Sequence, residues 1–158
     1  MRKNSLMTRA LIRVLHIWFL LSRPMTLGVR AVVFDEDHNS VLLVRHTYVP
    51  GFQLPGGGVE PGETMEQALG RELEEEGNII LEVPPTLKSV HFNNRVSRRD
   101  HVALYLVTRF HSTGTAVASR EIAEAAFYRL DALPADTTAA TRRRLAEIFD
   151  GVPPEATW

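Results

Sequence analysis

The sequence contains no cysteine among its 158 residues. Disulfide bonds, thiolate nucleophiles and cysteine-ligated metals are therefore excluded, and a reducing compartment fits, so we expect a cytoplasmic protein. An excess of charge of one sign is also nearly absent, because 18 Lys and Arg residues stand against 19 Asp and Glu residues. This balance does not support nucleic-acid binding through the overall charge of the protein, so we expect no nucleic-acid partner.

A long uninterrupted apolar run is missing as well. The most apolar stretch, residues 8–22, is shorter than the roughly 20 residues that a membrane span needs, and it contains Arg13 and His16. No small-residue cleavage site of a secretory signal follows it. The stretch instead predicts a helix that stops at Pro24, with Arg9, Arg13 and His16 on one polar stripe. We expect this helix to pack on its own domain or on a second copy in a homodimer; a position on a membrane surface is the alternative.

Length and composition predict one globular domain with a sizeable core, since 44% of the residues are hydrophobic and 23% are charged. We divide the chain into an N-terminal amphipathic helix (1–24), a folded domain (25–152) and a loose tail (153–158). Two further helices are predicted at 65–77 and 138–149. Strands are predicted at 27–34, 41–44, 79–83, 87–92, 102–110 and 126–130. This order of elements fits an α/β fold.

Residues 57–79, GGVEPGETMEQALGRELEEEGNI, are the most informative part of the chain. Thr64 followed three residues later by Gln67 predicts a capped helix start. Gly77 and Asn78 predict its end, because both tolerate the left-handed conformation found there.

This helix carries four glutamates near its C-terminus. A run of charges usually forms a solvated face opposite the apolar residues, but on a wheel of about 100° per residue only Glu74 lies opposite. Glu72 and Glu76 share the apolar face, and Glu75 lies at its edge. The residues of that face are Met65, Ala68, Leu69 and Leu73. Carboxylates at this spacing repel one another and oppose the helix dipole. The pattern therefore predicts a bound hard cation, Mg²⁺ with Mn²⁺ as the alternative.

The same stretch resembles the Nudix box, G-x5-E-x7-R-E-U-x-E-E-x-G-U, where U is a bulky aliphatic residue. Eight of its nine fixed positions match, and these are Gly57, Glu63, Arg71, Glu72, Leu73, Glu75, Glu76 and Ile79. Asn78 stands where the pattern has glycine, and Asn is the next-best residue for a left-handed helix end. The chain is thus similar to the Nudix, or MutT-like, hydrolases. The resemblance implies an α/β/α sandwich around a mixed sheet, with the N-terminal helix as an addition.

The resemblance also implies an activity, the hydrolysis by water of a diphosphate linkage in a nucleoside diphosphate joined to another group. Glu72, Glu75 and Glu76 would then bind the metal. A backbone carbonyl of Gly56 or Gly57 would complete its shell. The family also implies a structural ion pair, here between Glu63 and Arg71.

The general base would be Glu72 or a glutamate outside the box. Because the family often places that glutamate shortly before an aromatic residue on a late strand, Glu121 and Glu124 ahead of Phe127 are candidates, and the offset favours Glu121. The alternative is that both glutamates are solvated carboxylates on a surface loop, with no role in catalysis.

The partner implied is a small nucleotide or nucleoside diphosphate derivative, whose identity the sequence does not give. Arginine offers a two-pronged donor to phosphate, and aromatic rings stack on bases. The substrate-binding candidates are Arg45, His46, Tyr48, Phe52, Phe92, Arg95, Arg98 and Glu124. Ordinary loop or core packing is the alternative for each. Among the histidines, His46 and His91 are expected nearest a ligand. A non-catalytic nucleotide-binding regulatory domain is the rival function, which the full set of acidic box positions disfavours.

Overall fold

The computed structural model describes residues 3–22, 24–114 and 120–158. Its centre is a five-stranded mixed sheet in the order β4-β5-β1-β2-β7. These strands are β1 (Thr26–Asp35), β2 (Ser40–His46), β4 (Thr86–Phe92), β5 (Asp100–Val107) and β7 (Ile122–Arg129). β1 and β5 run parallel, and the other neighbours run antiparallel. A separate two-stranded sheet joins β3 (Ile79–Leu81) to β6 (Phe110–Ser112).

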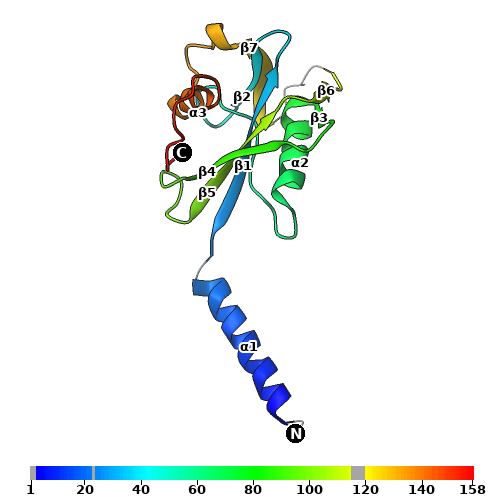
Figure 1. Ribbon diagram of the computed structural model, residues 1–158, viewed down its shortest axis with the longest axis vertical. Helices are drawn as coiled ribbons and strands as arrows, with labels where there is room; N and C mark the ends of the chain where they lie inside the picture. The colour runs from blue at the N-terminus through cyan, green and yellow to red at the C-terminus, as the bar shows by residue number, and fades with distance from the viewer. Residues whose placement is uncertain (1–2, 23, 115–119) are drawn as a thin grey trace.

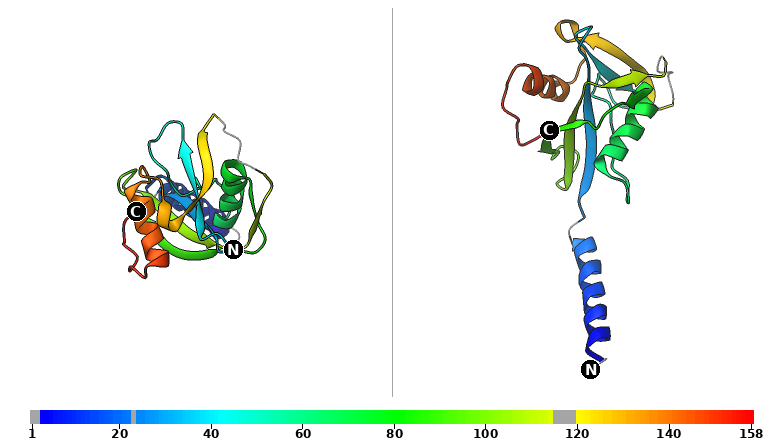
Figure 2. Two further views of the ribbon diagram at one scale, coloured as in Figure 1. Left: turned by 90° about the horizontal axis from the view of Figure 1, so that it is seen from above. Right: turned by 45° about the vertical axis from the view of Figure 1, so that its right-hand side comes forward.

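Two helices cover opposite faces of the central sheet (Figures 1 and 2). They are α2 (Met65–Gly77) and α3 (Ala139–Phe149), the latter preceded by a short 3-10 helix (Leu130–Ala132). Side chains of β1 alternate between the two layers, since Val29 and Val33 pack toward α2 whereas Val32 packs in the cluster of Leu145 on α3. The predicted α/β/α sandwich with a mixed sheet is confirmed.

Helix α2 begins and ends where local chemistry predicts. The Thr64 side chain accepts from the Gln67 N–H, and the Gln67 side chain accepts from the Thr64 N–H, so the capping box is complete. Asn78 ends the helix in the left-handed conformation with φ of 53°. Gly77 packs so closely on β2 that an added Cβ would lie 2.6 Å from Leu42 Cδ2.

Two strand predictions were wrong in their extent. The strand predicted at 102–110 is divided, because Phe110 leaves the central sheet and pairs with Leu81 of β3. The strand predicted at 126–130 begins earlier, since β7 pairs with β2 from Ile122 opposite His46 onward. Pairing partners far along the chain decide both boundaries. Residues 115–119, in the connection between the strands predicted at 102–110 and 126–130, lie outside the described residues.

The tail predicted to be loose is instead held against β4. The Phe92 N–H donates to the Ala156 carbonyl at 2.9 Å, and the Trp158 N–H donates to the Phe92 carbonyl at 3.1 Å. Arg144 of α3 donates to the Thr157 carbonyl and lies over the Trp158 ring. β4 is an edge strand of the sheet, so its open backbone groups are available to the tail.

Helix α1 (Lys3–Ser22) extends away from the domain (Figures 1 and 2). All of its described side chains are exposed, so the prediction that it packs on its own domain was wrong. In the described part of the chain, no helix combines the length and apolarity that crossing a bilayer requires.

Candidate active site

A glycine-rich loop lies along β1 and positions the site. The Val29 N–H donates to the Gly57 carbonyl at 2.9 Å, and the Ala31 N–H donates to the Pro55 carbonyl at 3.0 Å. Gly56 has φ of 132°, and a Cβ there would lie 2.1 Å from the Val29 carbonyl oxygen. Only glycine therefore fits at this position.

The same loop brings backbone atoms against the carboxylate of Glu72. A Cβ built on Gly57 would lie 2.3 Å from Glu72 Oε1. The absence of a side chain at Gly57 thus lets the Glu72 carboxylate lie directly beside the loop backbone, where a shared ligand could be held.

Arg71 ties this loop to α2. Its Nε donates to Glu63 Oε1 at 3.1 Å and its Nη2 donates to Glu63 Oε2 at 3.2 Å, so the pair is two-pronged. Nη2 also donates to the Gly58 carbonyl and Nη1 donates to Glu72 Oε1. The hydrogen bonds to Arg71 hold the pKa of Glu63 below its usual value.

Glu76 is the buried member of the box, with 7% of the residue exposed. Its Oε2 accepts from the Gly56 N–H at 2.7 Å, and its Oε1 lies 3.6 Å from His46 Nε2. Burial raises the pKa of Glu76 to about 7, although the Gly56 hydrogen bond and the charge of Arg30 act in the opposite direction. The surrounding groups therefore do not offset the free-energy cost of burying the negative charge of Glu76.

The two glutamates outside the box lie in different environments. The charge of Glu121 acts on His46, whose pKa burial lowers, and the Glu121 carbonyl accepts from the Thr47 N–H. Glu124 instead pairs with Arg45 at 2.5 Å and accepts from the Tyr128 hydroxyl at 2.6 Å. Glu121 therefore lies near the histidine that contacts Glu76, whereas Glu124 belongs to a separate polar network.

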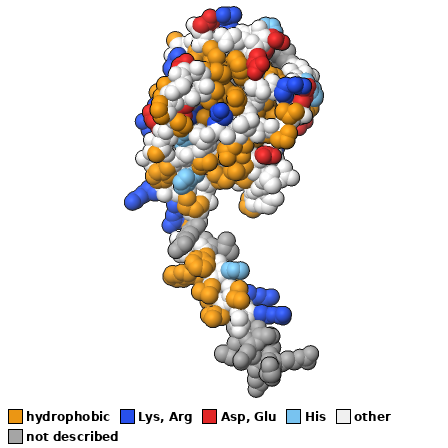
Figure 3. Space-filling model, in the orientation of Figure 1, with side chains coloured by type: hydrophobic (Ala, Val, Ile, Leu, Met, Phe, Trp, Pro, Cys, Tyr) orange, Lys and Arg blue, Asp and Glu red, His pale blue; other side chains and the backbone are white. Residues whose placement is uncertain are grey.

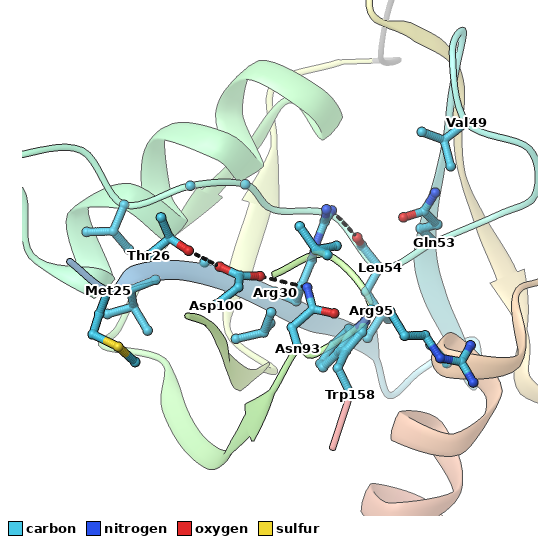
Figure 4. A pocket seen from close by; sticks show the side chains of 18 of the residues that line it. Met25, Thr26, Arg30, Val49, Gln53, Leu54, Asn93, Arg95, Asp100 and Trp158 are labelled. Atoms are coloured by element: carbon cyan, nitrogen blue, oxygen red, sulfur yellow. Dashed lines mark hydrogen bonds between the residues drawn. The ribbon is translucent and has the colours of Figure 1, made fainter. Parts of the chain in front are cut away.

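A cavity of about 1020 Å³ adjoins the glycine-rich loop. Figure 4 shows Arg30, Arg95 and Trp158 among its lining side chains. Arg30 donates to the Leu54 carbonyl at 2.9 Å. Burial lowers the pKa of Arg30, while the charges of Glu76 and Glu72 act in the opposite direction. Arg30 thus links the cavity electrostatically to the box carboxylates.

Several of the predicted substrate-binding residues are engaged elsewhere in the structure. The side chain of Phe52 is in the core and packs on the Tyr128 ring, so it is not available to stack on a base. The backbone of Phe92 pairs with the tail, and its ring lies against the His101 ring, with centroids 5.4 Å apart. His91 is fully buried against Arg144, away from the box. Tyr48 lies beside His46, with ring centroids 5.3 Å apart.

Sequence reasoning missed two residues, Arg30 and Trp158. Arg30 interrupts an otherwise apolar strand, and a charge in such a strand is a signal that could have been used. Trp158 had no such signal, because its place in the cavity depends on the docking of the tail.

In the described part of the chain, no three acidic or histidine side chains are already grouped as metal ligands. Glu72 and Glu75 both turn toward Arg71 Nη1, at 2.8 and 3.6 Å, and Glu76 turns toward Gly56. The donor set nevertheless fits a hard divalent cation, because it consists of carboxylate and carbonyl oxygens and includes the undercompensated Glu76.

The glutamate-rich box of residues 57–79 and the α/β/α sandwich together indicate the family to which the chain belongs. The NUDIX domain model matches residues 24–148, and the chain belongs to the NUDIX family. Among solved structures, a MutT NUDIX hydrolase from Burkholderia pseudomallei is 30% identical with a TM-score of 0.66, and the match covers 78% of this chain and 97% of that one. The predicted family and fold are confirmed. Helix α1 lies outside the family match.

Two curated relatives carry more specific names. The ADP-ribose pyrophosphatase of Methanocaldococcus jannaschii is 35% identical over 102 residues, which are 63% of this chain and 60% of that protein. A putative 8-oxo-dGTP diphosphatase of Bacillus subtilis is 45% identical over 51 residues, which are 32% of this chain and 34% of that protein. The matches thus span less than two thirds of either relative.

Proposed function

We propose that this protein is a metal-dependent pyrophosphohydrolase, which hydrolyses the diphosphate linkage of a nucleoside diphosphate joined to another group. The observation that carries this proposal is Glu76. It is an acidic side chain buried on the inner face of α2, with its pKa raised to about 7 and the glycine-rich loop against it. The ionised carboxylate destabilises the fold in such a place, and a proton or a bound cation relieves this.

One set of residues would bind the metal ion, and a second set would bind the substrate. Glu72, Glu75, Glu76 and a carbonyl of Gly56 or Gly57 would hold Mg²⁺ or Mn²⁺. When bound, the ion would neutralise phosphate oxygens and lower the pKa of a coordinated water. The Arg71–Glu63 pair fixes the loop relative to α2.

The surrounding residues would bind the substrate and accept the proton. Arg30 and Arg95 line the cavity, and there they would contact phosphate oxygens of the substrate. Glu121 is our choice for the general base outside the box, because its charge acts on His46 and His46 contacts Glu76; Glu72 is the alternative.

The named relatives suggest the first substrates to examine, ADP-ribose and 8-oxo-dGTP. The cavity is as large as the upper range for pockets that hold a drug-sized ligand, roughly 1,000 Å³. It therefore has room for a nucleoside together with part of the second group, which favours a compound of the ADP-ribose type.

The test is a panel of nucleoside diphosphate derivatives and triphosphates with Mg²⁺ or Mn²⁺, read by phosphate or pyrophosphate release. Glu76→Gln should lose most turnover. Glu74→Gln is the matched control, since Glu74 is exposed on the opposite side of α2, and it should retain turnover. Equal activity in both variants would contradict the metal-ligand assignment. Tight nucleotide binding without turnover of any compound would instead support a regulatory binding domain.

A further inference from the structure

Helix α1 presents an apolar face whose five named side chains below are all exposed in the described part of the chain. Five large side chains recur at the spacing i, i+3, i+4, i+7 and i+10, so they share one side of the helix. They are Leu11, Val14, Leu15, Trp18 and Leu21, and all are exposed. The exposed fraction reaches 75% at Leu21. A continuous exposed apolar face of this kind marks a docking surface.

The opposite side of α1 is cationic. Arg9, Arg13 and His16 lie on it, and Figure 3 shows the basic side chains on one side of the helix and apolar ones on the other. The sequence has no Asp or Glu before Asp35, whereas residues 1–24 carry Arg2, Lys3, Arg9, Arg13 and Arg23. The partner should therefore be apolar within and anionic at its surface.

The adjoining end of the domain has the same character. The loop at 93–99 lies beside the start of β1, because the Thr26 N–H donates to the Arg99 carbonyl at 3.0 Å. This loop exposes Arg98 and Arg99 and also Val96, which is 75% exposed. Figure 3 shows basic side chains at the end of the domain nearest the helix. Helix and loop thus offer cationic and apolar groups at one end of the molecule.

We propose that α1 and the 93–99 loop together bind the surface of an anionic lipid bilayer. The helix would lie in the interface, with Trp18 and its apolar neighbours among the acyl chains and the arginines at the headgroups. A spanning arrangement is not proposed, since α1 lacks the apolarity for one.

A second copy of the chain would explain the apolar face but not the charges. Paired helices commonly flank their apolar seam with acidic and basic side chains that attract across the interface. Residues 3–22 contain no acidic residue to supply such pairs, and the exposed arginines of the loop would have no function in a helix pair.

The test is sedimentation of the full-length protein with two kinds of vesicle, one of phosphatidylcholine and one that also contains phosphatidylglycerol. The protein should bind the anionic vesicles much more tightly than the neutral ones, and salt should weaken this binding. Leu15→Gln/Trp18→Gln should lose binding to both kinds.

Arginine substitutions distinguish the contribution of α1 to vesicle binding from that of the 93–99 loop. Each arginine near an anionic surface contributes about 1 kcal/mol, so Arg9→Gln/Arg13→Gln should weaken anionic binding about 30-fold. Arg98→Gln/Arg99→Gln should weaken it comparably. The matched control is Arg109→Gln/Arg129→Gln, which should leave binding unchanged. It removes two exposed arginines, one shortly after the last residue of β5 and one that is the last residue of β7.

Two results would overturn the proposal. The first is equal or absent binding to the two kinds of vesicle. The second is a dimer in analytical ultracentrifugation that Leu15→Gln/Trp18→Gln dissociates, without vesicle binding, because a second copy would then cover the face.

Discussion

At the scale of single residues, burial makes the ionised form of Glu76 unfavourable. Its pKa is raised to about 7 by burial, above the usual 4.5. The folded metal-free protein therefore binds an extra proton between these values. The stability that this proton confers is complete below the lower pKa and is lost as pH rises through the upper one.

Glu76→Gln should consequently stabilise the metal-free protein at alkaline pH. The glutamine can still accept from the Gly56 N–H and carries no buried charge. The difference in unfolding free energy between variant and wild type should grow by about 2 kcal/mol from about pH 5.5 to about pH 8. Urea unfolding in the presence of a chelator measures it. A difference independent of pH would show that Glu76 titrates normally.

The glycines of the loop allow a second prediction. An added methyl group at Gly57 would meet the Glu72 carboxylate, which can rotate away, whereas one at Gly58 would meet nothing within 4 Å. Gly57→Ala should stay folded but lose activity at least tenfold, because Glu72 is displaced from the loop. Gly58→Ala should keep both the fold and the activity. Thermal unfolding and turnover of each variant give the comparison, and equal turnover would show that the Gly57 contact is not needed.

At the scale of elements, the tail, β4 and α3 form one unit around Arg144. This guanidinium is fully buried and donates to Glu147 Oε1 at 2.6 Å and to the Thr157 carbonyl at 3.1 Å. Its Nη1 also lies 2.7 Å from His91 Nδ1. The tail is thus held by hydrogen bonds to the two members of this α3 ion pair, since Arg144 donates to the Thr157 carbonyl and Glu147 accepts from the Glu155 N–H, and not by strand pairing alone.

Arg144→Ala should destabilise the fold by about 3–5 kcal/mol, because it leaves the buried Glu147 carboxylate without its partner. Chemical denaturation measures the change. Arg109→Ala is the control, since its pair with Glu82 is exposed and should contribute less than about 1 kcal/mol. Similar values for the two variants would mean that the Arg144 network contributes no more than a surface pair.

At the scale of the whole molecule, α1 is structurally independent of the family domain. Every described side chain of the helix is exposed, and the family match begins at residue 24. Deletion of residues 1–22 should therefore leave the urea unfolding midpoint and the turnover of soluble substrate unchanged. A lower midpoint would show that α1 packs on the domain in solution.

The sequence by itself determined the features that depend on neighbours along the chain. The capping box at Thr64, the left-handed end at Asn78 and the face shared by Glu72 and Glu76 all follow from spacing within one helix. Helical periodicity and cap chemistry act over a few residues, so they can be read directly. The family and its sandwich fold followed from the same stretch.

The tertiary structure alone decided what depends on distant partners. It divided the strand predicted at 102–110, held the tail on β4 and separated Glu121 from Glu124. It also placed Arg30 beside the box and left α1 uncovered. Each of these outcomes depends on which strand edges and side chains meet after folding, and residues so far apart in the chain leave no local pattern.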